Sequence, residues 1–214
     1  MKSITGHHSL RRLRLAEVPS DTVELARFLI GKIVVHDLTV GRLSGRIVET
    51  EAYPPGDPAS HHFRGPTQRN RSLFLRYGHV YVYFNYGAHF MLNISSEPMG
   101  IGGGVLIRAL EPLDGVTLMQ KHRKTTQLLN LTRGPGRLAA ALRIDRSLDG
   151  LDLFARGPLW LGEIAPANSA KHRNAISTQV GAAVRIGITR AAERVLRFYE
   201  RGNPFVSGPK RLLT

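Results

Sequence analysis

The sequence predicts an α+β protein, a single mixed domain over residues 1–214 with a largely antiparallel sheet and peripheral helices. Most of the expected elements are strands that follow one another directly, which favours antiparallel pairing over a wound parallel sheet. Hydrophobic residues make up 42% of the 214 residues, which is enough for one core of ordinary size. The sequence contains no internal repeat or low-complexity segment that would indicate a second unit.

The first expected element is a short helix over residues 23–29. Asp21 and Glu24 have the spacing of a capping box, and Gly31 follows the apolar run as a helix stop. The other helical segments that we expect are a turn over residues 69–75 and helices over residues 115–122 and 135–142, the last with proline in its first turn.

Short runs of β-branched and aromatic residues between turn signals predict the strands. The expected strands are residues 33–36, 42–51, 79–84, 90–94, 105–110 and 182–188. Residues 196–199 fit a strand and a helix equally well. Residues 85–88 are expected to form a hairpin tip, and residues 165–178 a surface loop.

The charge of the chain indicates a partner with many negative charges. Lys and Arg number 30 against 16 Asp and Glu, which gives a formal net charge of +14 and a pI near 11.0. Nucleic acid is the polyanion that fits best, although a merely basic protein, such as a ribosome-associated one, has the same composition. Without a secretory signal or an apolar run of bilayer length, we expect a soluble, cytoplasmic monomer that does not enter membranes.

Metal and thiol chemistry are disfavoured. The chain has no cysteine, which excludes thiolate nucleophiles, disulfides and cysteine-based metal sites. His61 and His62 are adjacent, but a His-His pair without cysteine or helical spacing makes a poor zinc site. We therefore expect neither a metal nor another cofactor. A histidine in the loop after Tyr53 is better suited to form a flat, hydrogen-bonding wall of a pocket than to bind a metal.

Two glutamates are the first candidates for catalysis. Period-two alternation places Glu49 and Glu51 on one strand face, about 7 Å apart, where each raises the pKa of the other unless a cation intervenes. A raised pKa would help one of them to act as a base near neutral pH. A solvated strand face is the commoner explanation of a Glu-x-Glu pattern. Tyr53 and the proline-rich residues 54–58 follow at once and indicate a pocket wall, which narrows the advantage of that explanation without reversing it.

Two carboxylates at this spacing also fit an inverting sugar glycosidase. Sugar clefts usually offer tryptophan platforms, whereas the chain has a single tryptophan, Trp160, which is distant in the sequence. The positive net charge also favours a polyanionic substrate, so sugar hydrolysis is disfavoured.

The densest group of aromatic rings lies in residues 81–90. Alternation places Tyr81, Tyr83 and Asn85 on one face of the strand. The simplest interpretation of Phe84 and Phe90 is that they are core residues. Tyr86 precedes Gly87 at the expected turn and is harder to bury, so it is a candidate for a ring that projects and enters a base stack.

Two arginines stand at informative places. Arg108 follows an apolar run, where it is either an edge residue with its charge in solvent or a cation brought to the two glutamates. Arg137 follows Gly134-Pro-Gly at an expected helix start, where a phosphate could sit, although a plain helix start explains the pattern equally well.

Several blocks of the sequence resemble the alkyladenine (3-methyladenine) DNA glycosylases of the mammalian type. These blocks are residues 45–53, the pattern Tyr81-x-Tyr83-x-x-Tyr86-Gly87, residues 91–96 and residues 105–112. The resemblance implies a monofunctional enzyme of base excision repair, which flips an alkylated purine out of double-stranded DNA and hydrolyses its N-glycosidic bond. Deaminated adenine (hypoxanthine) is a candidate second substrate. The alternative from a different class is a non-catalytic nucleic-acid-binding module.

The resemblance also assigns roles to individual residues. It implies that Glu51 is the base that activates water and that Arg108 is a partner of this water and of a nearby phosphate. Tyr86 would be the wedge that fills the vacated stack. Arg137, where the family commonly has lysine, would contact DNA. The walls of the base pocket would be Tyr53, His61, Tyr83 and Asn93, the last of which would reject guanine.

Overall fold

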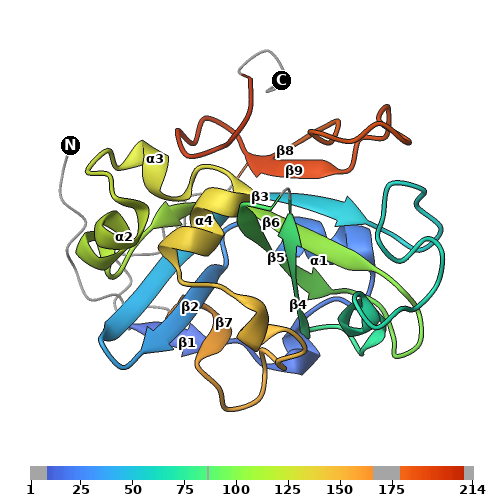
Figure 1. Cartoon of the computed structure of the whole chain (residues 1–214), viewed down its shortest axis with the longest axis horizontal. Helices are drawn as coiled ribbons and strands as arrows, with labels where there is room; N and C mark the ends of the chain where they lie inside the picture. Colours follow the sequence, from blue (N-terminus) through green and yellow to red (C-terminus); the bar gives the residue numbers. More distant parts are fainter. Residues whose placement is uncertain (1–8, 86, 166–178, 210–214) are drawn as a thin grey trace.

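In the computed structural model, which describes residues 9–85, 87–165 and 179–209, nine strands form one curled antiparallel sheet (Figure 1). The strand order is β1-β7-β2-β3-β6-β5-β4, and β9 pairs with both β3 and β8. The predicted α+β class and the antiparallel sheet are therefore confirmed. The strands are β1 (Leu10–Arg12), β2 (Ile33–Leu38), β3 (Gly41–Tyr53), β4 (Val80–Asn85), β5 (His89–Ser95), β6 (Gly104–Pro112), β7 (Leu159–Ile164), β8 (Val180–Ala183) and β9 (Arg197–Glu200).

Short helices flank the sheet. The side chain of Asp21 accepts hydrogen bonds from the backbone N–H groups of Val23 and Glu24, so the predicted N-cap of the first helix is confirmed. This helix packs against β3 and β6, and the last α-helix packs against β5 and β6. The α-helices are α1 (Thr22–Phe28), α2 (Val116–Arg123), α3 (Leu129–Thr132) and α4 (Pro135–Ala141), with 3₁₀ turns at Leu15–Glu17, Arg71–Phe74 and Arg146–Leu148.

Strand β3 is the structural centre of the molecule because three other strands pair with it. Strand β2 pairs with its first half, β6 with its second half, and β9 with residues 49–51. In the β3–β6 ladder Ile47 lies opposite Leu110, Glu49 opposite Ala109, and Thr50 opposite Ile107. The register thus slips once on each strand, at Val48 and at Arg108. Such bulges redirect side chains, and here they lie where Glu49 meets Arg108.

The structure also corrects several expectations. Strands β1 and β7 and helix α3 were not predicted, and the ambiguous residues 196–199 coincide with strand β9. The strand expected over residues 182–188 ends at Ala183. Phe84 is not a core residue: it is 47% exposed and packs beside Phe90, at 5.0 Å between ring centroids. The loop expected at residues 165–178 lies almost wholly outside the described residues.

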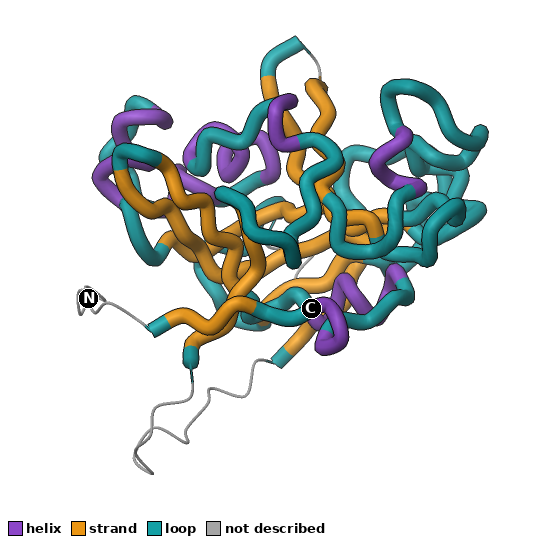
Figure 2. The backbone as a smooth tube through the Cα atoms, turned by 90° about the horizontal axis from the view of Figure 1, so that it is seen from below, coloured by secondary structure: helices purple, strands orange, loops and turns teal. Residues whose placement is uncertain are grey.

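The β4–β5 hairpin stands out from the rest of the sheet. Figure 2 shows the ends of these two strands projecting from the body of the molecule. The strands pair from Val80 opposite Ile94 to Asn85 opposite His89. The predicted hairpin is therefore confirmed, and Tyr86 at its tip lies outside the described residues.

Candidate active site

A cavity of about 570 Å³ opens at the C-terminal half of β3. This volume is in the range of small-molecule sites and suffices for a purine and its sugar. The cavity brings together strands β3 to β6 with the loop over residues 58–62 and the segment over residues 186–190. Among its lining residues are Glu51, Tyr53, His61, Tyr81, Tyr83, Asn93 and Arg108. Six of the predicted site residues therefore lie around one cavity.

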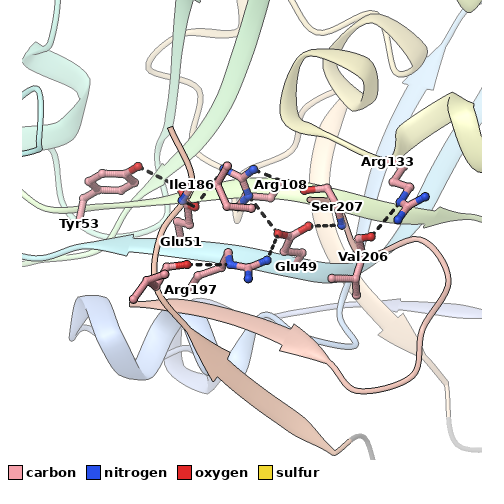
Figure 3. A network of polar contacts seen from close by, with 10 residues as sticks. Glu49, Glu51, Tyr53, Arg108, Arg133, Ile186, Arg197, Val206 and Ser207 are labelled. Carbon is pink, nitrogen blue, oxygen red and sulfur yellow. Dashed lines mark hydrogen bonds and ion pairs between the residues drawn. The ribbon is translucent and has the colours of Figure 1, made fainter. Parts of the chain in front are cut away.

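Glu51 lines this cavity, and its side chain is fully buried. Its Oε1 accepts hydrogen bonds from the backbone N–H of Ile186 at 2.7 Å and pairs with Arg108 Nη1 at 3.0 Å. Its Oε2 accepts from the hydroxyl of Tyr53 at 2.9 Å (Figure 3). A carboxylate oxygen has two lone pairs, so Oε2 has the capacity to accept a further hydrogen bond from a ligand in the cavity.

Arg108 lies between the two glutamates. Its Nε donates to Glu49 Oε1 at 3.1 Å, while Nη1 contacts Glu51 (Figure 3). Burial opposes the charge of the guanidinium, but the two carboxylates outweigh it, and the pKa of Arg108 lies above its ordinary value. The sequence left open whether Arg108 is an edge residue or a cation near the glutamates, and the second alternative is correct. The repulsion expected between the glutamates is therefore offset by a cation.

Glu49 belongs to a separate, fully buried network behind the site. Besides Arg108, it accepts from Arg197 Nη1 at 3.0 Å and from the backbone N–H of Ser207 at 2.7 Å. Glu49 and Arg197 have no exposed surface. The two glutamates thus differ in position: Glu51 faces the cavity, whereas Glu49 faces β9 and the segment that follows it.

Three rings form one wall of the cavity. Tyr81 and Tyr83 are stacked at 5.5 Å, and the imidazole of His61 packs edge-on to Tyr83 at 4.4 Å. His61 Nδ1 shares a hydrogen bond of 3.0 Å with the hydroxyl of Tyr81. Burial raises the pKa of Tyr81 to about 12, so its hydroxyl stays protonated at neutral pH. Burial and the charge of Arg69 lower the pKa of His61, which favours a neutral ring.

Asn93 has a fixed orientation at the edge of this wall. Its Nδ2 donates to the backbone carbonyls of Tyr81 at 3.2 Å and of Met91 at 3.4 Å. Both partners are acceptors, so they determine which end of the amide is the nitrogen.

Exposed arginines lie at and near the cavity. Exposed Arg190 lines it and also lines a neighbouring cavity of about 250 Å³, to which Arg64 and Arg69 contribute. Arg137 is exposed on α4, where its Nη1 donates to Asn130 at 3.0 Å, and it does not line the cavity. The adjacent Pro135 does line it.

Several residues that complete the site were not found from the sequence. They are Asp57, Arg185, Ile186, Arg197 and Ser207. Ile186 contributes a backbone N–H, for which no side-chain pattern exists. The others are single polar residues, Arg197 at the start of β9 and the rest in irregular segments, and they reach the site only through contacts over long sequence separations.

Two further observations concern the part of the chain that the structure describes. No helix there has the length and apolar character to cross a membrane. That part also holds no group of three or more His, Asp or Glu side chains arranged for a metal ion.

A buried carboxylate paired with arginine lines a cavity walled by aromatic rings, with exposed arginines nearby, and this arrangement fits a hydrolase for an aromatic heterocycle carried on a polyanion. Comparison with known proteins agrees with this class. The chain belongs to the methylpurine-DNA glycosylase family, whose model matches residues 16–204.

Relatives from three organisms support the same family. A protein of Mesorhizobium japonicum is 61% identical over 92% of this chain and 90% of its own length. A protein of Paraburkholderia phytofirmans is 49% identical over 92% of this chain and 88% of its own length. A protein of Methanoculleus marisnigri is 45% identical over 87% of this chain and 94% of its own length. Each carries the provisional name 3-methyladenine DNA glycosylase. Because these relatives are bacterial and archaeal, the comparisons support the family and give no support to the narrower mammalian type.

Proposed function

We propose that this chain is a monofunctional DNA glycosylase that flips an alkylated purine, with hypoxanthine as a candidate second substrate, out of double-stranded DNA and hydrolyses its N-glycosidic bond. The observation that carries the proposal is the position of Glu51. Its carboxylate is buried, yet it lines a cavity of purine size and retains the capacity for one more hydrogen bond. Such a group can hold a water molecule beside a sugar carbon and accept its proton.

The reaction follows from this geometry. A water molecule held by Glu51 Oε2 attacks C1′ of the sugar, and a water proton passes to the carboxylate. The bond from C1′ to the purine nitrogen breaks, and its electron pair leaves with the base. A ring-alkylated purine carries a positive charge that this pair neutralises, so the base leaves without prior protonation. The positive charge that develops on the sugar is stabilised by Glu51. The products are a free base and an abasic strand.

The walls of the cavity provide recognition of the base. Tyr53, His61 and Tyr83 present rings against which a flat base can stack, and a cationic base gains an additional cation–π attraction. Asn93 lines the cavity with an oriented amide, and we assign to it the role that the family resemblance implies, which is to crowd the exocyclic amine of guanine. Since the carbon that reacts is inaccessible in stacked DNA, the nucleotide must be flipped to reach Glu51.

The outer surface supports binding to DNA. The β4–β5 hairpin projects from the body of the molecule. Tyr86 lies outside the described residues, and its role as a wedge stays a prediction from the sequence. Arg137, Arg64, Arg69 and Arg190 are exposed, and we assign to them contacts with phosphates. We expect one monomer to bind one lesion.

Replacement of Glu51 by Gln tests the mechanism. Gln keeps the shape of the side chain but cannot accept a proton at this position, so we expect excision to fall by about a hundredfold or more while binding to damaged duplex is retained. Single-turnover release of 3-methyladenine or 7-methylguanine measures the rate, and Glu163→Gln, far from the cavity, is the control. Full activity of Glu51→Gln would remove Glu51 from the mechanism. A wild-type protein that binds duplex without excising any base would favour the non-catalytic module.

A further inference from the structure

Behind the base pocket lies a buried ion pair that joins two distant parts of the chain. Both side chains of the pair, Arg185 and Asp57, have no exposed surface. Arg185 Nη1 contacts Asp57 Oδ2, and Nη2 donates to Oδ1 at 3.2 Å, so the pair is bidentate. Nη1 also donates to the backbone carbonyl of Ala52 at 3.1 Å. A second arginine, Arg194, approaches Asp57 Oδ2 at 3.7 Å from the surface.

The guanidinium of Arg185 covers one face of the Tyr53 ring. Its central carbon lies 4.6 Å from the ring centroid, within the range of a cation–π contact. Its Nε is buried and has no hydrogen-bond partner among the described residues. Tyr53 lines the cavity, whereas Arg185 and Asp57 do not. The arginine therefore occupies the side of the ring turned away from the cavity and leaves the other side for a ligand.

The Arg185–Asp57 pair is also connected to Glu51 and to the loop that carries His61, which lie beside Tyr53 in the site. The residue after Arg185 is Ile186, whose N–H holds Glu51 Oε1 at 2.7 Å. Asp57 opens the loop that carries His61: its Oδ1 accepts from the backbone N–H of Ala59 at 2.9 Å. One ion pair is thus connected to the stacking ring, to the start of the His61 loop and to the candidate catalytic carboxylate.

We propose that Arg185, through its pair with Asp57, is a positioning residue that sets the Tyr53 ring and the Glu51 carboxylate at the separation that a flipped purine requires. The inference rests on the proposed function. Arg185 does not touch the substrate. It acts by holding the ring from behind and by placing the 185–186 backbone against Glu51. Because a displacement of about 1 Å can lower an enzymatic rate about a hundredfold, loss of this support should appear mainly in the rate of the chemical step.

The test compares Arg185→Met, Arg185→Lys and Asp57→Asn with a matched control. Arg46→Met is the control, since Arg46 is also largely buried and lies between two carboxylates, Glu111 and Glu200, away from the cavity. Single-turnover excision of 7-methylguanine from duplex DNA gives the maximal rate and the protein concentration at half-saturation, and thermal unfolding gives Tm. We expect Arg185→Met to lower the maximal rate by about tenfold to a hundredfold. The half-saturating concentration should change less, and Arg46→Met should lower Tm with the rate preserved.

The remaining variants distinguish positioning from general stability. Lysine can pair with Asp57 but lacks the planar fork that reaches Ala52 as well, so Arg185→Lys should recover part of the rate. The double variant Asp57→Asn/Arg185→Met should lose less transition-state stabilisation, calculated from the maximal rate, than the sum of the losses in the two single variants. The reason is that both substitutions act through one contact. A folded Arg185→Met with the wild-type maximal rate would overturn this inference alone. Equal rate losses in Arg46→Met and Arg185→Met would also overturn it, in favour of general stability. Wild-type protein without excision would overturn the proposed function and this inference together.

Discussion

At the scale of single residues, the site separates two glutamates that look equivalent in the sequence. Glu49 and Glu51 both contact Arg108, but only Glu51 lines the cavity. The distinction depends on environment, because Glu49 is enclosed by Arg197 and the N–H of Ser207. Similarly, His61 is set apart from the adjacent His62 by its contact with the Tyr81 hydroxyl at the cavity wall.

The pH dependence of excision should report on His61. Burial and Arg69 lower its pKa below the ordinary 6.5, so the ring is neutral at pH 7 and gains a proton only below pH 6.5. That proton would repel a cationic purine. We therefore expect excision of 7-methylguanine to be constant from pH 8 to about 6.5 and to decline at lower pH. His61 remains solvent-accessible at the cavity mouth, so the shift in its pKa should be moderate.

The stability of the fold should change with pH in the same direction as the rate of excision. The folded protein binds fewer protons than the unfolded chain between the lowered pKa of His61 and 6.5, so the free energy of unfolding also decreases as the pH falls through this window. Rate profiles of wild type, His61→Gln and the control His122→Gln check the assignment. An unchanged acid limb in His61→Gln would assign the titration to another group.

At the scale of elements, the paired bulges between β3 and β6 explain how one strand presents Glu49 to a buried ion network and Glu51 to the cavity. The slips in register at Val48 and Arg108 bring Glu49 to face Arg108 and β9, while Glu51 faces the cavity. Strand β9 and the segment that follows it supply Arg197 and Ser207 to the same carboxylate. Glu49 therefore ties together the bulged strands and the C-terminal part of the described chain.

Replacement of Glu49 by Gln should strongly destabilise the fold. Removing this charge breaks the ion pairs that Glu49 makes with the buried Arg108 and Arg197, and breaking a buried ion pair in this way costs about 3–5 kcal/mol. The control is Glu163→Gln: Glu163 contacts Arg11 and Lys32, each at 2.6 Å, but its side chain is 28% exposed. We expect Glu163→Gln to lower the free energy of unfolding by about 1 kcal/mol or less. Urea unfolding of both variants measures the difference, and equal losses would contradict a special role for the Glu49 network.

At the scale of the whole molecule, the net charge of +14 and the arginines around the cavities predict that phosphate contacts dominate affinity for DNA. These arginines lie near the β4–β5 end of the sheet, where the cavity opens. Binding and excision would then occur on one face, with the hairpin and the basic rim surrounding the flipped nucleotide.

Salt dependence should quantify this surface. If about five side chains neutralise phosphates, the logarithm of the association constant should fall against the logarithm of salt concentration with a slope near −4.5. Arg64→Ala and Arg137→Ala should each reduce the magnitude of the slope by about 0.9. Arg14→Ala, near β1 at the other end of the strand order, should leave it unchanged. Equal slopes for all three variants would place the DNA elsewhere on the protein.

Much of the fold and site could be predicted because the relevant signals are local. The alternation of residues 42–51, the cap at Asp21 and the aromatic hairpin each depend on neighbours in sequence, and the structure has these elements where they were expected. Glu51 and Tyr83 likewise lie on predicted strands, which fixed the face on which each of these side chains appears. Tyr53 lies beyond the predicted end at residue 51, because β3 continues to Tyr53. Strands β1 and β7 are less regular in pattern and were missed for that reason.

The support of the site depends on contacts between distant segments. Local patterns in the sequence were enough to predict the class of fold, the basic surface and the segments that carry the carboxylate and the rings. Arg185 reaches Asp57 across a sequence separation of 128 residues, and Arg197 reaches Glu49 across 148. No local periodicity encodes such contacts, because they depend on the pairing of β9 with β3 and on the bulged register of β3 with β6. The sequence thus supplied the reactive groups, and the packing of distant segments determined their orientation.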